Sequence, residues 1–296
     1  MKKSVGILLL ISVIAISFAA IFVKWSDAPA TVLSMYRMYL ACVLLLPMVY
    51  INRNQFLKLS KKNWFLLFIA GVFLALHFAL WFGSLKLTTV ASSTIILSLQ
   101  PIFALFGGFL IYKERTHIST ILAIGISIVG VVMVGWADFG HSNKSVIIGD
   151  ILSFLSVIAI VGYLLIGQNN VKRISHWVYS FCVFLFAAIS LNIYNLFSDL
   201  PIIGYDSKEW EIFILLAIFP TIAHVIYNFL LNTVNTTTIS MSILGEPIGA
   251  TFLAVIILGE SIILSQIIGG FFVIFGVFLF LVQQNKINRL LSNQGL

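Results

Sequence analysis

The chain has 296 residues, of which 60% are hydrophobic and only 9% are charged, with a formal net charge of +7. A soluble domain of this length needs far more charge on its surface, so this composition excludes a soluble globular protein. The apolar residues form long runs without charge; residues 4–23 would span about 30 Å as a helix. The sequence therefore predicts an all-α integral membrane protein with many spans.

Apolar runs along the chain predict ten transmembrane helices. In chain order they cover about residues 4–23, 30–50, 64–83, 88–112, 118–136, 146–166, 177–197, 211–231, 236–258 and 262–282. The first run could instead be a secretory signal, because Lys2 and Lys3 precede it and Ala19 ends a weak cleavage-like triplet. Further spans follow immediately, so a retained first helix is the favoured interpretation.

The basic residues lie mainly on one side of these spans. With the N-terminus inside, twelve Lys and Arg residues fall in internal segments and only four fall in external ones, at Lys24, Lys86, Lys144 and Lys208. This asymmetry predicts a multi-pass protein of the plasma membrane with both termini in the cytoplasm. The positive net charge then reflects orientation, and we expect no nucleic-acid partner.

Two of the predicted spans carry a proline at corresponding places in the two halves, at Gln100-Pro101 and Glu246-Pro247. The two sites are 146 residues apart (246 − 100 = 146). Five spans in each half would insert the second half in the opposite orientation, so the pattern predicts two inverted five-helix repeats over residues 4–136 and 146–282. Paired broken helices are typical of secondary transporters with a site at mid-membrane depth.

The residues around these breaks resemble a known family. The first half contains FVKWSDAPATVLSMYRMYLA and HFALWFGSLKLTTVASSTIILSLQPIFALFGGFLIYKERTH, and the second half contains SILGEPIGATFLAVIILGES. These stretches are similar to the EamA-type domains of the drug/metabolite transporter superfamily, as two EamA-like units that cover nearly the whole chain. The resemblance implies a ten-helix bundle that transports small metabolites by alternating access about a central cavity, and it does not indicate a substrate.

Glu246 is the first candidate ligand for a substrate or an ion. It lies about ten residues into its span, roughly 15 Å deep, where an acid normally faces a cavity or a partner. Pro247 removes a backbone donor, so the carboxylate and a freed carbonyl could together bind a cation, an ammonium group or a proton. The alternative is a structural hydrogen bond or ion pair at the kink. Gln100 occupies the matching place and is neutral, so a charge-dependent role would belong to the second half alone.

Arg37 lies about seven or eight residues into the second span, roughly 12 Å deep. Its depth overlaps that of Glu246, so a buried ion pair between the two is possible. A second alternative is that Arg37 receives a substrate carboxylate, because its planar guanidinium binds such groups through two hydrogen bonds. A structural anchor is the third interpretation.

Aromatic and imidazole residues form a further candidate set at similar depth. His77 and Trp81 share one face of the third span, and His224, Tyr227 and Asn228 share one face of the eighth. A cavity lined by rings with a few polar tips suits an amphipathic or aromatic metabolite. The alternative is that these side chains only pack between helices or bond to neighbouring carbonyls.

Secondary transport is the function that this pattern supports best. We expect a carrier that exports small metabolites such as amino acids or drug-like compounds, with proton exchange as a candidate driving force. No G-x-x-x-x-G-K-[ST], H-E-x-x-H or G-x-S-x-G motif is present, so an enzyme is not predicted. An intramembrane transferase and a non-transporting membrane scaffold are the alternatives.

The sequence predicts neither a cofactor nor a metal site. Cys42 and Cys182 stand apart within apolar runs and are most simply small core residues. The expected partners are a small-molecule substrate, protons and the lipid bilayer, with the protein acting as a monomer or a homodimer.

Overall fold

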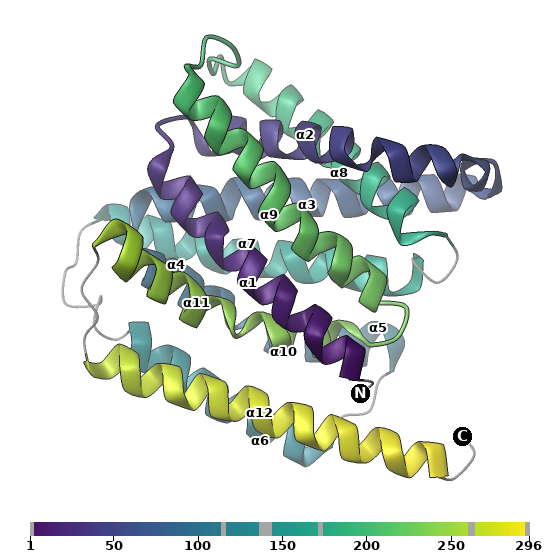
Figure 1. The fold of residues 1–296 in the computed structure, drawn as a ribbon, viewed down its shortest axis with the longest axis vertical. Coiled ribbons are helices and arrows are strands. Elements are labelled where there is room, and N and C mark those ends of the chain that lie inside the picture. Colours follow the sequence, from purple (N-terminus) through teal and green to yellow (C-terminus); the bar gives the residue numbers. More distant parts are fainter. Residues whose placement is uncertain (1–2, 114–116, 136–143, 171–173, 260–263, 294–296) are drawn as a thin grey trace.

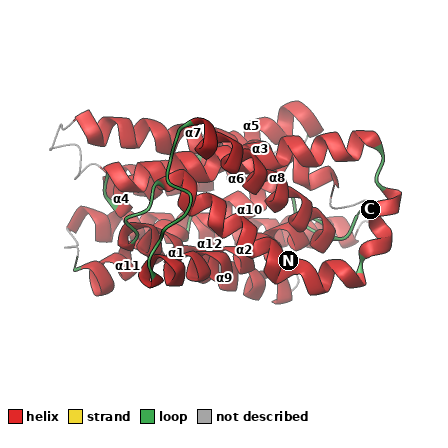
Figure 2. Cartoon of the chain, turned by 90° about the horizontal axis from the view of Figure 1, so that it is seen from above, coloured by secondary structure: helices red, strands yellow, loops and turns green. Residues whose placement is uncertain are grey.

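The computed structural model describes residues 3–113, 117–135, 144–170, 174–259 and 264–293. Within these ranges all regular elements are helices and there is no strand (Figure 2). The first half contains α1 (Lys3–Trp25), α2 (Ala30–Ile51), the 3₁₀ helix η1 (Arg53–Lys58), α3 (Lys61–Leu87), α4 (Val90–Leu97), α5 (Gln100–Tyr112) and α6 (Ile118–Gly135). The second half contains α7 (Lys144–Asn170), α8 (His176–Phe197), α9 (Ser207–Leu230), α10 (Thr236–Ile243), α11 (Glu246–Leu253), the π-helical turn η3 (Ala254–Leu258) and α12 (Leu264–Asn293).

The helices of the two halves begin at a constant spacing. Helices α8 to α12 each begin 146 residues after the corresponding helix from α2 to α6; for α2 and α8 this is 176 − 30 = 146. The spacing between the two proline sites therefore extends over five pairs of helices. This regularity is consistent with a two-repeat architecture.

The packing of the helices follows the same correspondence. α2 packs on α8 and α6 packs on α12, so each of these helices contacts its own counterpart. α1 packs on α9, and the equivalent contact of α7 with α3 is also present. Figure 1 shows α6 and α12 side by side at one end of the molecule, with α2 and α8 toward the other end. These paired contacts are those of a pseudo-twofold arrangement.

Both predicted breaks are interruptions between separate helices. Two residues separate α4 from α5, and two separate α10 from α11. Pro101 and Pro247 each occupy the second position of the new helix, where proline's missing N–H has no intrahelical partner to lose. Each proline-containing span is therefore two short helices rather than one kinked helix, with Gln100 or Glu246 as the first residue of the second helix.

The distribution of polarity is that of a membrane protein. Among the described residues, seven helical segments are long and apolar enough to cross a membrane: α1, α2, α3, α7, α8, α9 and the combined segment Thr236–Leu258. Large apolar side chains such as Phe106, 61% exposed, cover the outside, whereas Arg37 and Glu246 are buried. An apolar exterior around buried polar groups is what a bilayer requires. The chain is therefore a multi-pass membrane protein.

Candidate functional site

The two helix breaks adjoin one central cavity. The half-helices pack in a crossed order, α4 on α11 and α5 on α10, which brings the two breaks to the same level of the bundle. Both halves of the chain contribute to the lining. It consists of Ile16 from α1, His77 and Trp81 from α3, Leu97 from α4, Gln100 from α5, Ile160 and Leu164 from α7, His224 and Tyr227 from α9, Ile243 from α10 and Glu246 from α11.

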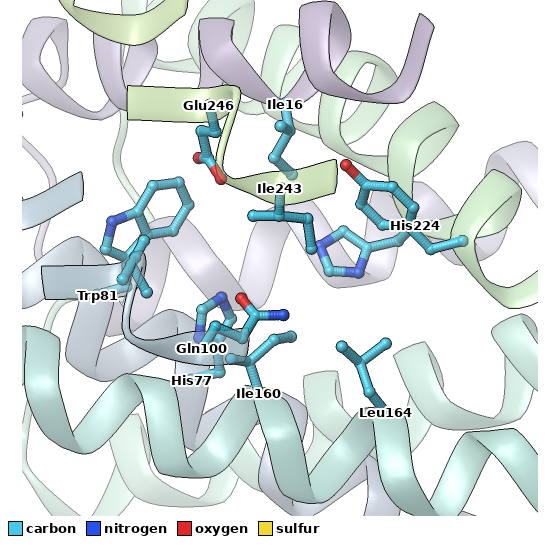
Figure 3. Close-up of a pocket in the computed structure, with 11 residues that line it drawn as sticks. Ile16, His77, Trp81, Gln100, Ile160, Leu164, His224, Ile243 and Glu246 are labelled. Carbon is cyan, nitrogen blue, oxygen red and sulfur yellow. The ribbon is translucent and has the colours of Figure 1, made fainter. Parts of the chain in front are cut away.

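The open space at the centre of this cavity is about 20 Å³. That volume holds one or two water molecules and is far smaller than a metabolite. In Figure 3 the carboxyl group of Glu246 points into the space, with Trp81 and His224 on opposite sides and Gln100 across from it. Polar atoms from both repeats therefore converge on a cavity that is too small for a metabolite in this conformation.

Glu246 and Gln100 differ in how their polar atoms are satisfied. The Gln100 amide donates to Ser240 Oγ at 3.1 Å, which joins α5 to α10. Glu246 is 4% exposed, and its Oε1 has no hydrogen-bond partner among the described residues. Because Glu246 opens α11, the partial positive charge of the helix N-terminus favours its carboxylate. The second half thus supplies an acceptor that remains available to a ligand.

The imidazole and aromatic residues line opposite walls. The Trp81 ring stacks on His77 at a centroid distance of 5.8 Å, and His77 Nδ1 lies 3.1 Å from the Ser156 carbonyl oxygen. On the α9 wall, His224 and Tyr227 meet edge to face at 6.1 Å. Trp81 Nε1, both ring nitrogens of His224 and the Tyr227 hydroxyl have no hydrogen-bond partner in the described part of the chain.

Arg37 lies behind this wall and does not line the cavity. Its guanidinium carbon is 3.6 Å from the centre of the Phe78 ring, and the side chain is fully buried. None of its three guanidinium nitrogens has a hydrogen-bond partner among the described residues. The ion pair with Glu246 that the sequence left open is not formed: no salt bridge joins Arg37 to Glu246 in the described part of the chain.

Asn228 also lies outside the cavity lining. Its side-chain oxygen accepts a hydrogen bond from the Tyr163 hydroxyl at 2.6 Å, and its amide donates to Ser180 Oγ at 2.9 Å. Both polar ends of this amide are therefore engaged, and the bonds connect α9 to α7 and α8. Such interhelical hydrogen bonds hold membrane helices together.

Five aliphatic lining residues were not predicted from the sequence: Ile16, Leu97, Ile160, Leu164 and Ile243. Isoleucine and leucine occur throughout the predicted spans, so no local signal separates those facing a cavity from those facing lipid. Only the packing of the helices makes that distinction.

Polar contacts join the helices at both ends of the bundle. At the end where α1 meets α2, Glu209 accepts from the Ser26 hydroxyl at 2.5 Å and from the Asp27 backbone N–H at 2.6 Å, while Lys86 Nζ donates to the Ser26 carbonyl. We call this group the Glu209 network. At the opposite end, Gln168 Oε1 accepts from the backbone N–H and the hydroxyl of Thr236, at 2.7 and 2.6 Å.

The polar groups around the cavity suit hydrogen bonding to an organic molecule. Within the residues that the structure describes, no three His, Cys, Asp or Glu side chains form a group that could hold a metal ion. Cys42 and Cys182 are both buried and unbridged. The unpaired carboxyl, indole, imidazole and phenol groups can instead exchange hydrogen bonds with a small organic molecule.

Comparison with protein families matches residues 3–136 and 147–282 to the EamA-like transporter family. A Clostridium kluyveri protein described as an uncharacterized transporter is 24% identical over 258 residues, covering 85% of this chain and 83% of its own length. A Synechocystis protein with the same description is 27% identical over 244 residues, covering 77% of this chain and 68% of its own length.

The fold is also shared with a solved protein structure. A crystal structure with 16% sequence identity superposes with a TM-score of 0.77 and covers 97% of this chain and 99% of the other. At this level of identity the match establishes the common fold alone.

Proposed function

This chain belongs to the EamA-like transporter family, and from that premise we propose that it is a secondary carrier that exports a small organic metabolite across the plasma membrane by alternating access. The two relatives described as transporters point in the same direction, away from an intramembrane enzyme.

The observation that carries the proposal is the cluster of unpaired polar groups at the helix breaks. Glu246, Trp81, His224 and Tyr227 all present atoms without a hydrogen-bond partner among the described residues, although each side chain is buried. Leaving such a group unpaired costs roughly 1–3 kcal/mol. A ligand that supplies the missing partners would recover part of that cost, which is how a binding site differs from a packed core.

The lining favours an amphipathic substrate. Rings of Trp81 and Tyr227 and the five aliphatic side chains offer apolar contact, while Glu246 and His224 offer polar contact. Such a mixture suits a compound with an apolar body and a polar or cationic group, such as an amino acid or a drug-like molecule. Asn228 and Arg37 would then support the wall from behind rather than touch the substrate.

The contacts at the two ends support a cycle in which the cavity opens to one side at a time. In the proposed topology the Glu209 network faces outside and the Gln168–Thr236 contact faces the cytoplasm. Both are formed around a cavity with space only for water. A substrate therefore needs one of them to break and the cavity to widen, and opening both at once would produce a leak.

Ten spans follow if the interrupted pair α4–α5 and the helices α6 and α12 are each counted as one crossing beside the seven long segments. The repeats would cover residues 4–136 and 146–282 in inverted orientation, with both termini in the cytoplasm as the distribution of basic residues predicts.

Proton coupling would depend on Glu246, because it is the acid that the cavity lining contains.

Cysteine accessibility tests the alternating route without knowledge of the substrate. Ile243→Cys, in a chain whose Cys42 and Cys182 are replaced by alanine, places one thiol in the cavity lining. A membrane-impermeant maleimide should label it from either side of oriented vesicles that remain tight to small solutes. Ile222→Cys, on the exposed face of α9, is the control and should react from neither side. Labelling of Ile243→Cys from one side only would contradict the proposal.

A further inference from the structure

A second cavity, larger than the central one, lies where α3 begins and where α5 and α7 end. Its volume is about 360 Å³. It is lined by Lys62, Leu66, Ile111, Tyr112, Leu165, Ile166, Asn169 and Asn170. We propose that this cleft binds the headgroup region of an anionic phospholipid from the cytoplasmic leaflet. The leaflet assignment rests on the topology proposed above.

The rim of the cleft carries polar groups that suit a phosphate. Lys62 lies in the first turn of α3, and Asn169 lies in the last turn of α7. Neither side chain makes a hydrogen bond or an ion pair within the described part of the chain. An ammonium group and an amide donor therefore face one space, and the described residues of the lining include no acid.

The deeper wall of the cleft is apolar. Leu66 lies one turn further into α3 than Lys62, and Leu165 and Ile166 lie one turn further into α7 than Asn169. Ile111 completes the wall and is 61% exposed on the outer surface. A free anion would use the rim and leave this wall uncovered. A phospholipid has both a phosphate for the rim and acyl chains for the wall, and basic pockets between cytoplasmic helix ends are typical of such recognition.

The cleft is separate from the central cavity. The Tyr112 hydroxyl donates to the Leu165 carbonyl and closes the wall between α5 and α7. Leu164 lines the central cavity while its neighbour Leu165 lines the cleft. A lipid in the cleft would thus pack against the same turn of α7 that forms one side of the transport site, without entering that site.

Native mass spectrometry of the full-length protein in neutral detergent tests the proposal. We expect phosphatidylglycerol to be retained in preference to phosphatidylcholine with the same acyl chains. Lys62→Gln should weaken phosphatidylglycerol retention about fivefold, the effect of one lysine at an anionic membrane surface. Lys61→Gln is the matched control, because it removes the same charge from the adjacent residue outside the lining, and retention should be unchanged.

A second variant separates the apolar wall from the charge. Leu66→Trp should narrow the apolar part of the cleft and reduce retention of phosphatidylglycerol with Lys62 intact, and melting without lipid checks that each variant is folded. Equal retention of the two lipids, equal losses in Lys61→Gln and Lys62→Gln, or equal thermal protection by inorganic phosphate alone would overturn the proposal. Any of these results would leave the carrier proposal standing, because that proposal is tested by the accessibility of Ile243→Cys.

Discussion

The guanidinium carbon of Arg37 lies 3.6 Å from the centre of the Phe78 ring, and no ion pair with Glu246 is present among the described residues. Phe78 contacts His224 in turn, at a ring-centroid distance of 5.3 Å. Phe78 therefore lies between the Arg37 guanidinium and His224 in the cavity wall. A cation–π contact of this kind contributes roughly 0.5–2 kcal/mol, which is less than the cost of burying a guanidinium without hydrogen bonds.

This balance predicts that Arg37 adds no net stability. Arg37→Met should leave the melting temperature unchanged or raised, while transport per folded molecule falls because the wall behind His224 has lost its charge. Arg53→Met is the matched control: Arg53, in η1, covers the Tyr50 ring at the end of α2 at 4.4 Å and is not part of the cavity lining, so neither property should change. A large drop in melting temperature for Arg37→Met with unchanged transport would identify Arg37 as a structural anchor.

The ring-lined walls of the cavity lead to a prediction about substrate preference. Trp81→Ala and Tyr227→Ala should change the relative transport of aromatic and aliphatic compounds more than they lower the melting temperature, because both rings face the cavity with unpaired polar atoms. Trp210→Ala is the control for aromatic size, since Trp210 packs on Tyr36 and Phe213 away from the cavity. Similar losses of stability in all three variants, without a change of preference, would favour plain packing.

Much of the fold could be read from the sequence because a bilayer imposes strong patterns. Long apolar runs predicted the membrane class, and the spacing between the two proline sites extends to the starts of five helix pairs. The sequence did not show whether each break is a kink or the start of a new helix. A proline inside an apolar run is compatible with a kink or with a new helix, and its place in the first turn became clear only from the backbone.

The cavity lining was predicted less completely than the fold. His77, Trp81, Gln100, His224, Tyr227 and Glu246 stand out in sequence as polar or aromatic groups at mid-span, and they line one cavity. Arg37 and Asn228 stand out in the same way but lie behind it. Depth along a helix can be counted from the sequence, whereas the direction of a face depends on how neighbouring helices pack, which a single sequence does not specify.

The Glu209 network predicts a shift in the accessibility of the cavity. Glu209→Gln keeps the shape of the side chain but replaces a charged acceptor of two hydrogen bonds with a neutral group. Each hydrogen bond to a charged group contributes roughly 1 kcal/mol more than a neutral one, and two such bonds are weakened, so labelling of Ile243→Cys from outside should rise roughly fivefold to thirtyfold. Glu211→Gln, an exposed position on the same helix, should have no effect. Unchanged labelling in Glu209→Gln would show that the network does not hold the outer side closed.

The contact between α6 and α12 predicts a stability difference between two glycines of one helix. A Cβ atom at Gly130 would lie 2.5 Å from the Gly269 carbonyl oxygen and 2.7 Å from the Val273 nitrogen, whereas one at Gly125 would meet nothing within 4 Å. Gly130→Ala should therefore destabilise the protein by about 1–3 kcal/mol, as overpacking does. Gly125→Ala should be neutral or stabilising, because alanine favours helix. Equal melting temperatures for both variants would contradict the close packing of α6 on α12.

The central claim is that Glu246 at the helix break acts directly in transport. The most direct test measures transport in proteoliposomes. The transported compound is first identified by comparing the metabolites of cells with and without this protein. Glu246→Gln should abolish uphill transport driven by a proton gradient and should retain exchange of the compound at equal concentrations. Glu211→Gln should retain both activities. Full uphill transport by Glu246→Gln would contradict the account.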